Sequence, residues 1–97
     1  MQIRRLGREG PEVSALGYGG MSFSDFYGPT DEAASHAILD AMIEAGVSHF
    51  DTSNVYGAGR SESWLGSYLK GQPQARDALV IATKAGISKT AEGARRF

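Results

Sequence analysis

The fold is constrained most strongly by one short run, Leu79-Val80-Ile81-Ala82-Thr83-Lys84, which is almost continuously apolar up to its lysine. Such a run is typical of strands that are buried on both faces of a parallel sheet. Neighbouring parallel strands must be joined by a long crossover, which is usually a helix. The run therefore predicts that helices alternate with strands in the sequence before it.

Two upstream segments have helical patterns. The first is predicted to begin at the N-cap Thr30, to carry Asp31 and Glu32 in its first turn, and to end at Gly46. The second is predicted over residues 61 to 70. Their predicted apolar positions are Ala34, Ala37, Ile38, Ala41, Met42 and Ala45 in the first helix, and Trp64, Leu65, Tyr68 and Leu69 in the second.

The opposite face of the first helix carries polar residues at a spacing of four. His36, Asp40 and Glu44 share this face, which we expect to be solvated. His36 is therefore interpreted as a surface histidine beside a carboxylate, and not as a catalytic group.

A second strand is predicted between the helices, from Val47 to Asp51. Side chains alternate along a strand, so His49 and Asp51 share one face while Phe50 takes the other. With Phe50 under the helices, Asp51 lies at the mouth of the sheet and His49 one layer deeper. We interpret His49 as a hydrogen-bonded core histidine, a ligand role being the alternative.

The N-terminal region is predicted to contain a hairpin, formed by residues 2–6 and 12–16, and a brief strand at 15–18. Glycines follow that strand, and glycine lets backbone approach a ligand closely. The dinucleotide fingerprint G-x-G-x-x-G fails here because Ser22 stands at the third glycine position. An aromatic loop comes next, and Phe23, Phe26 and Tyr27 in it are either a hydrophobic plug or the wall of a substrate pocket.

The remaining segments are predicted to be irregular. Residues 72–76 read as a polar turn containing Pro73, and residues 85–97 show no periodicity and read as a loop. The predicted order is thus a hairpin followed by strand, helix, strand, helix and strand. Two successive right-handed crossovers bring the carboxyl ends of all three strands to one edge, which is where α/β folds place their chemistry.

Composition argues against several classes of partner. The 97 residues have a formal net charge of −1, so nothing indicates binding to nucleic acid or to anionic lipid. No signal-peptide core or membrane-spanning run is visible, and cysteine is absent, so we expect a cytoplasmic protein without thiolate metal sites. No metal is predicted.

Three side chains are predicted to meet at the sheet edge. Asp51 and Lys84 end consecutive parallel strands, and Tyr56 follows in the loop between them. Asp51 is a plausible counter-ion for Lys84, and an ammonium close to a phenol stabilises the phenolate, which makes the phenol a competent acid for a carbonyl oxygen. The alternative is a buried Asp–Lys pair with a tyrosine that only packs.

Several ordered motifs resemble the N-terminal part of the aldo-keto reductases. They are Arg5-Leu6-Gly7, Leu16-Gly17-Tyr18-Gly19-Gly20-Met21, the segment from Gly46 to Gly57, Ser61-Glu62-Ser63-Trp64-Leu65-Gly66 and Ile81-Ala82-Thr83-Lys84. The helix start at Phe26-Tyr27-Gly28-Pro29-Thr30-Asp31-Glu32 looks like the branch related to potassium-channel β subunits. The resemblance spans nearly the whole sequence.

The resemblance implies a (β/α)₈ barrel that reduces aldehydes and ketones with NADPH. By resemblance Tyr56 is the proton donor, Lys84 its assistant and Asp51 the partner of Lys84, while Gly20, Met21 and Asp51 contact the nicotinamide end of the cofactor. The family's fourth catalytic residue is a histidine after the fourth strand, and neither His36 nor His49 has such a place.

A complete barrel has roughly 250 residues. We therefore expect residues 1–97 to be the N-terminal part of a single barrel domain, inactive alone, with a small carbonyl compound as substrate and with barrel edges open to association. An NADPH-sensing regulatory subunit and a truncated, non-catalytic relic are the alternatives.

Overall fold

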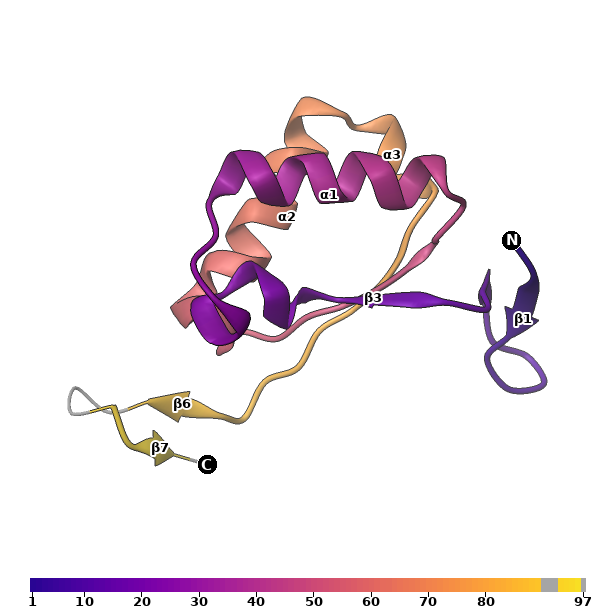
Figure 1. Ribbon diagram of the computed structural model, residues 1–97. Helices are drawn as coiled ribbons and strands as arrows, with labels where there is room; N and C mark the ends of the chain where they lie inside the picture. Colours follow the sequence, from indigo (N-terminus) through magenta and orange to yellow (C-terminus); the bar gives the residue numbers. More distant parts are fainter. Residues whose placement is uncertain (90–92, 97) are drawn as a thin grey trace.

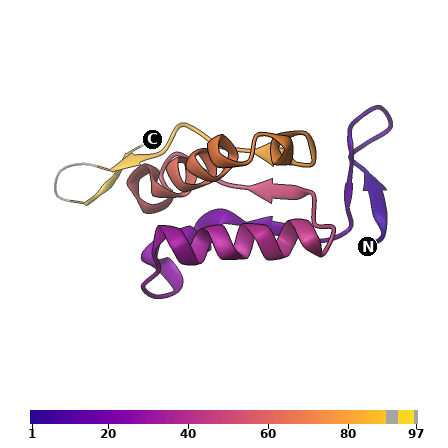
Figure 2. The ribbon, with the colours of Figure 1, turned by 90° about the horizontal axis from the view of Figure 1, so that it is seen from above.

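The central sheet consists of three parallel strands in the order β3 (Gly17–Gly19), β4 (His49–Asp51) and β5 (Val80–Ala82). These coordinates come from a computed structural model, which describes residues 1–89 and 93–96. Helix α1 (Glu32–Glu44) connects β3 to β4, and α2 (Arg60–Gly71) with the short α3 (Gln74–Asp77) connects β4 to β5. All three helices lie on the same side of the sheet (Figures 1 and 2). The predicted alternation of strands and helices is confirmed.

Two small hairpins lie at opposite ends of this layer. β1 (Ile3–Arg5) pairs antiparallel with β2 (Glu12–Ser14), which confirms the predicted N-terminal hairpin. β6 (Ser88–Lys89) pairs antiparallel with β7 (Arg95–Arg96) beyond the carboxyl ends of the parallel strands (Figure 1). The prediction of a loop over 85–97 is therefore wrong for these residues, because strands two residues long leave no period in a sequence. Residues 90–92 and 97 of that prediction lie outside the described part of the chain.

The strands are shorter than predicted, and one is displaced. β3 begins at Gly17 and not at Ala15, β4 comprises only the last three residues of its predicted run, and β5 only three residues within its run. The turn predicted over 72–76 is also partly wrong, because residues 74–77 form α3. In each case the hydrogen-bond partner and not the apolar pattern determines where the element begins and ends.

Helix α1 differs from its prediction in both cap and buried face. Its N-cap is Asp31, whose carboxylate accepts a hydrogen bond from the Ala34 backbone N–H at 2.7 Å, and not Thr30. The buried residues are Ser35, Leu39 and Met42, so the predicted position Met42 is confirmed and Ile38 is half-buried, whereas the predicted alanine positions are exposed. Alanine fits either side of a helix, so the alanines shifted the predicted stripe away from Ser35 and Leu39.

His36 joins α1 to α2, so its interpretation as a surface histidine is wrong. Its Nε2 lies 3.0 Å from the carbonyl oxygen of Trp64 and 3.0 Å from the hydroxyl of Ser67. Its ring also meets the Tyr68 ring edge to face at 5.4 Å. Next to it, the Asp40 carboxylate accepts a hydrogen bond from the Tyr68 hydroxyl at 2.7 Å. His36 and Asp40 thus contact α2, while Asp40 and Glu44 are exposed as predicted.

The core lies between the sheet and the helices. Phe50 is completely buried there, as the alternation along β4 predicts, and its ring packs at 5.5 Å from Phe23 and 5.8 Å from Tyr18. Removing a side chain such as Phe50 costs about 3–5 kcal/mol in a packed core. The other buried apolar residues of this cluster are Leu39, Met42, Leu65, Tyr68, Ala75 and Leu79.

The predicted aromatic loop is instead two short 3-10 helices, η1 (Gly20–Phe23) and η2 (Asp25–Tyr27). Its three aromatic side chains have different environments. Phe23 is fully buried in the core, whereas Phe26 and Tyr27 are 68% and 72% exposed and their rings meet edge to face at 5.0 Å. The plug interpretation is correct for Phe23, and Phe26 and Tyr27 remain candidates for a pocket wall.

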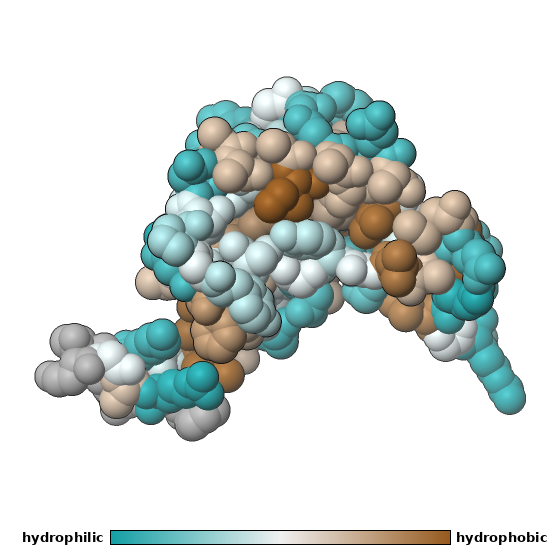
Figure 3. Space-filling model, in the orientation of Figure 1, coloured by the Kyte–Doolittle hydropathy of each residue, from teal (hydrophilic) through white to brown (hydrophobic). Residues whose placement is uncertain are grey.

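Apolar side chains remain exposed on the visible face of the molecule, around α1 and towards the N-terminal hairpin (Figure 3). Within the described residues β3 and β5 are also the edges of the sheet. No helix in the described part of the chain has the length and apolar character needed to cross a membrane. The large exposed apolar residues are Met1, Ile3, Leu6, Leu16, Phe26 and Tyr27.

Candidate active site

The candidate site lies where the parallel strands end. In the sheet, Gly19, Asp51 and Ala82 form the last row of paired residues. Backbone pairing continues beyond β4 and β5, since the Thr52 N–H donates to the Ala82 carbonyl at 2.8 Å and the Asn54 N–H donates to the Lys84 carbonyl at 3.1 Å. The backbone of Lys84 is therefore held beside the loop that follows Asp51, although β5 itself ends two residues earlier.

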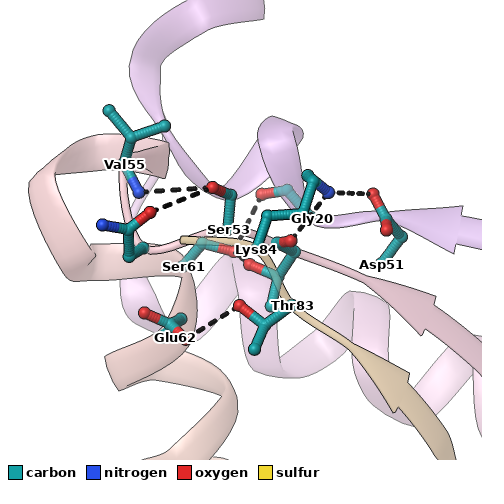
Figure 4. Close-up of polar contacts among 10 residues, drawn as sticks. Gly20, Asp51, Ser53, Val55, Ser61, Glu62, Thr83 and Lys84 are labelled. Atoms are coloured by element: carbon teal, nitrogen blue, oxygen red, sulfur yellow. Dashed lines mark hydrogen bonds and ion pairs between the residues drawn. The ribbon is translucent and has the colours of Figure 1, made fainter. Parts of the chain in front are cut away.

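The ammonium group of Lys84 has two hydrogen-bond acceptors from the end of β4. Its Nζ donates to Asp51 Oδ2 at 2.7 Å and to the backbone carbonyl of Thr52 at 2.8 Å (Figure 4). The first distance is short, as expected for a charge-assisted hydrogen bond. The structure thus brings Asp51 and Lys84 together as the sequence predicts, and Thr52 contributes an acceptor that the sequence reasoning did not include.

These contacts keep the lysine charged. The hydrogen bond that Lys84 donates to Asp51 raises the pKa of the Lys84 amine above its ordinary value, desolvation opposes the rise, and Tyr56 adds to it. An amine with such a pKa is an ammonium throughout the neutral range. Lys84 is therefore a cation, and not a base, at this edge.

The pair is not buried, which decides against one earlier alternative. The side chains of Lys84 and Asp51 are 48% and 49% exposed. An ion pair so accessible to water contributes only about 0–1 kcal/mol to stability. The interpretation as a buried structural ion pair is therefore wrong, and stability gives little reason for this arrangement.

Tyr56 covers the lysine from the loop after β4. Its ring centroid lies 5.2 Å from Lys84 Nζ, within the range of a cation–π contact. Tyr56 begins the short helix η3 (Tyr56–Gly59), in which Gly57 and Ala58 adopt the left-handed φ values of 62° and 56°. A Cβ at Gly57 would stand 2.9 Å from Arg60 Nε and 3.2 Å from Ser24 Cβ. The backbone directly after Tyr56 is therefore tightly constrained.

A cavity of about 1030 Å³ opens next to these groups. Tyr56 and Lys84 line it from the sheet edge, and Met21, Phe26 and Arg60 line other parts of its wall. Its size lies at the upper end of the range for sites that bind small organic molecules. Of the two exposed aromatic residues, Phe26 lines the cavity and Tyr27 does not.

The residues predicted to contact a cofactor divide into two groups. Met21 lines the cavity, whereas Gly20 and Asp51 lie outside its lining. Gly20 is buried, and a Cβ there would stand 2.7 Å from Ser61 Oγ and 2.9 Å from Phe50 Cε1. The absence of a side chain at this glycine therefore makes room for core side chains, and contact between its backbone and a cofactor stays a prediction.

His49 lies two residues before Asp51 on the same strand, and it is half-buried. Within the described residues its ring makes no hydrogen bond, so the interpretation as a hydrogen-bonded core histidine is wrong. The described chain also contains no group of three or more His, Asp or Glu side chains that could hold a metal ion.

Arg60 is a charged residue of the cavity that the sequence reasoning missed. Its guanidinium forms an ion pair with Asp25 at 3.0 Å and lies 5.3 Å from the centroid of the Trp64 ring. Among the described residues, the buried Nε atom of Arg60 has no hydrogen-bond partner. A usable signal was its place in the glycine-rich turn directly after Tyr56.

Known proteins match the chain over most of its length. The model of the Aldo/keto reductase family matches residues 15–96. Pyridoxal 4-dehydrogenase of Microbacterium luteolum is 40% identical over 93 residues, which are 96% of this chain and 26% of that protein. L-galactose dehydrogenase of Arabidopsis thaliana is 36% identical over 89 residues, which are 92% of this chain and 28% of that protein.

A solved structure agrees with these matches. The holo form of the aldo-keto reductase AKR11C1 from Bacillus halodurans superposes with a TM-score of 0.77 at 35% identity, covering 97% of this chain and 28% of that one. The chain thus spans about a quarter of the length of the relatives it matches. The predicted fold, a hairpin and the first strand–helix units of a (β/α)₈ barrel, is confirmed. The chain belongs to the aldo/keto reductase family.

Proposed function

We propose that the protein is an NADPH-dependent oxidoreductase that reduces the carbonyl group of an aldehyde or ketone, with Tyr56 as the proton donor. One observation supports this most directly: Lys84 Nζ is held 2.7 Å from Asp51 Oδ2 and 5.2 Å from the Tyr56 ring, at the wall of a cavity. The exposed ion pair contributes little to stability, so its geometry fits chemistry better than packing.

Each side chain has a distinct role in the proposed reaction. The Tyr56 phenol gives its proton to the carbonyl oxygen of the substrate, and the Lys84 ammonium stabilises the phenolate that remains. Asp51 and the Thr52 carbonyl hold the ammonium in place through their two hydrogen bonds. NADPH, when bound, would supply the hydride that reduces the carbonyl carbon. A proton from solvent then restores the phenol.

The nicotinamide end of the cofactor is proposed to bind beside Met21 and Asp51. Met21 lines the cavity next to the loop that carries Tyr56, and the backbone of Gly20 precedes it in η1. The cavity has room for such a ring and for a small carbonyl compound together. Two relatives are named as dehydrogenases, so the reverse direction, in which a Tyr56 phenolate takes the proton of an alcohol, belongs to the same proposal.

The test is steady-state turnover of the protein with NADPH and a simple aromatic aldehyde, and with NADP⁺ and an alcohol. Replacing Tyr56→Phe should lower kcat about a hundredfold or more with little change in cofactor affinity, because only the general acid is lost. Tyr68→Phe is the matched control, since it removes a phenol that contacts Asp40 on α1. It should keep its activity.

Two outcomes would contradict the proposal. Equal kcat in Tyr56→Phe and the wild type would remove Tyr56 from its role. A wild-type protein that binds NADPH and turns over no carbonyl compound or alcohol would favour the NADPH-sensing alternative instead.

A further inference from the structure

The first turn of α2 makes side-chain contacts with residues that follow all three parallel strands. Gly20, Thr52 and Thr83 are the residues directly after the last paired row of β3, β4 and β5. The Ser61 hydroxyl donates to the Gly20 carbonyl at 3.0 Å and lies 2.6 Å from Thr52 Oγ1. The next residue, Glu62, accepts a hydrogen bond from Thr83 Oγ1 at 2.9 Å (Figure 4). Two consecutive residues therefore join three strand ends.

We propose that Ser61 and Glu62 are positioning residues for the site, which set the spacing of the three strand ends and so place Lys84 against Asp51 and Tyr56.

Each of the residues that they contact is adjacent in sequence to a candidate site residue. Gly20 precedes Met21, Thr52 follows Asp51, and Thr83 precedes Lys84. A displacement of any strand end therefore moves a residue of the site.

Within the described residues, the hydrogen bonds of these two side chains go to the strand ends and not to the free N–H groups of α2. Acidic and hydroxyl residues in the first turn usually satisfy the free N–H groups of the helix, and a glutamate at the third position often accepts from the N-cap N–H. Here the N-cap is Gly59, with φ 100° and no side-chain cap. The Glu62 carboxylate and Ser61 hydroxyl instead reach across to the strand ends.

The two contacts differ in burial, and so in how firmly they are held. Ser61 and Thr52 are 0% and 1% exposed, so their hydroxyl pair is fixed inside the protein. Thr52 also passes this constraint on, because its backbone carbonyl accepts from Lys84 Nζ at 2.8 Å. The contact between Glu62 and Thr83 is exposed and holds the residue next to Lys84 from the other side. Lys84 is thus positioned by a buried contact through Thr52 and by an exposed contact through Thr83.

The exposed contact offers the cleaner experiment, because replacing Thr83 leaves the core unchanged. Thr83→Val removes the hydroxyl donor and keeps the shape, whereas Thr83→Ser keeps the donor. The measurement is the rate of reductive methylation of Lys84 at pH 9, relative to Lys70 in the same protein, read by peptide mass spectrometry. Methylation needs the neutral amine, so a lysine displaced from Asp51 should react faster.

We expect the methylation rate of Lys84 relative to Lys70 to rise about two- to tenfold in Thr83→Val, because a fall of one unit in the pKa raises the fraction of neutral amine about tenfold. In Thr83→Ser the relative rate should stay within about twofold of wild type. Glu62→Ala should act like Thr83→Val, and the double variant should add little to either, because both remove the same contact. Unchanged methylation in Thr83→Val and Glu62→Ala would overturn the proposal.

The catalytic consequence rests on the proposed carbonyl reduction. In an active enzyme Thr83→Val should lower kcat about tenfold with KM for NADPH unchanged, and Thr83→Ser should restore it. A protein without any reductase or dehydrogenase activity that still shows the methylation change would refute the proposed function and leave the positioning role standing. An active enzyme with no change in methylation or kcat would refute the positioning role alone.

Discussion

Replacing Gly20 by alanine tests the close packing behind the site. The new Cβ would stand 2.7 Å from Ser61 Oγ and 2.9 Å from Phe50 Cε1, and both of these side chains are 0% exposed. Neither can move into solvent, so the alanine displaces η1 or the core. Overpacking of this kind costs about 1–3 kcal/mol, and losing the hydrogen bond from Ser61 to the Gly20 carbonyl costs about 1 kcal/mol more. The free energy of unfolding should fall by about 2–4 kcal/mol.

The preceding glycine provides the matched control. A Cβ at Gly19 would meet nothing within 4 Å, and its φ of −95° suits any residue. Gly19→Ala should leave the free energy of unfolding unchanged or raise it by up to about 1 kcal/mol, because alanine restricts the unfolded chain.

Urea unfolding of the wild type, Gly19→Ala and Gly20→Ala, followed by far-UV circular dichroism without cofactor, gives the comparison. Equal m-values would show that the midpoints report stability. A Gly20→Ala variant within about 0.5 kcal/mol of Gly19→Ala would refute the packing argument. It would show that the strand end moves freely, and would also weaken the inference that Ser61 fixes it.

Two further predictions concern α1 and its contact with α2. Asp31→Ala should lower the free energy of unfolding by about 1 kcal/mol, because the Asp31 carboxylate caps the Ala34 N–H; Thr30→Ala should have a smaller effect, and the reverse order in urea unfolding would contradict the assigned cap. Burial, together with the hydrogen bond to Asp40, raises the pKa of Tyr68 to about 12. An unfolded tyrosine ionises near pH 10, so this contribution to stability is complete below pH 10 and is lost between about pH 10 and 12. Relative to wild type, Tyr68→Phe should lose less stability over that interval, and parallel pH profiles of the two proteins would count against the burial argument.

The candidate site was predictable to the extent that it depends on strand order. Asp51 and Lys84 follow from two rules, that parallel strands end at one edge and that side chains alternate along a strand. Tyr56 follows from its place five residues beyond Asp51 in a glycine-rich turn. The half-exposed state of the ion pair did not follow, because exposure depends on which segments surround the edge.

Errors occurred where several residues satisfy the same local rule. Thr30 and Asp31 are both good N-caps, and only the position of the first helical turn selects Asp31. The alanines of α1 are compatible with either side of the helix, so the prediction missed Leu39, which is buried by the position of the sheet. Gly20 shows the same limit, because its sequence context does not reveal whether a ligand or a core side chain needs the space.

The sequence by itself determined the alternation of strands and helices, the parallel sheet, the family and the meeting of Asp51 with Lys84, because hydrophobic period, crossover length and motif order are local properties of the chain. Only the tertiary structure decided which side chains connect the ends of the strands. The contacts of Ser61 with Gly20 and Thr52, and of Glu62 with Thr83, join residues that are 9 to 41 positions apart. Such contacts depend on how α2 packs against the sheet, and local sequence patterns do not predict contacts between residues so far apart in the chain.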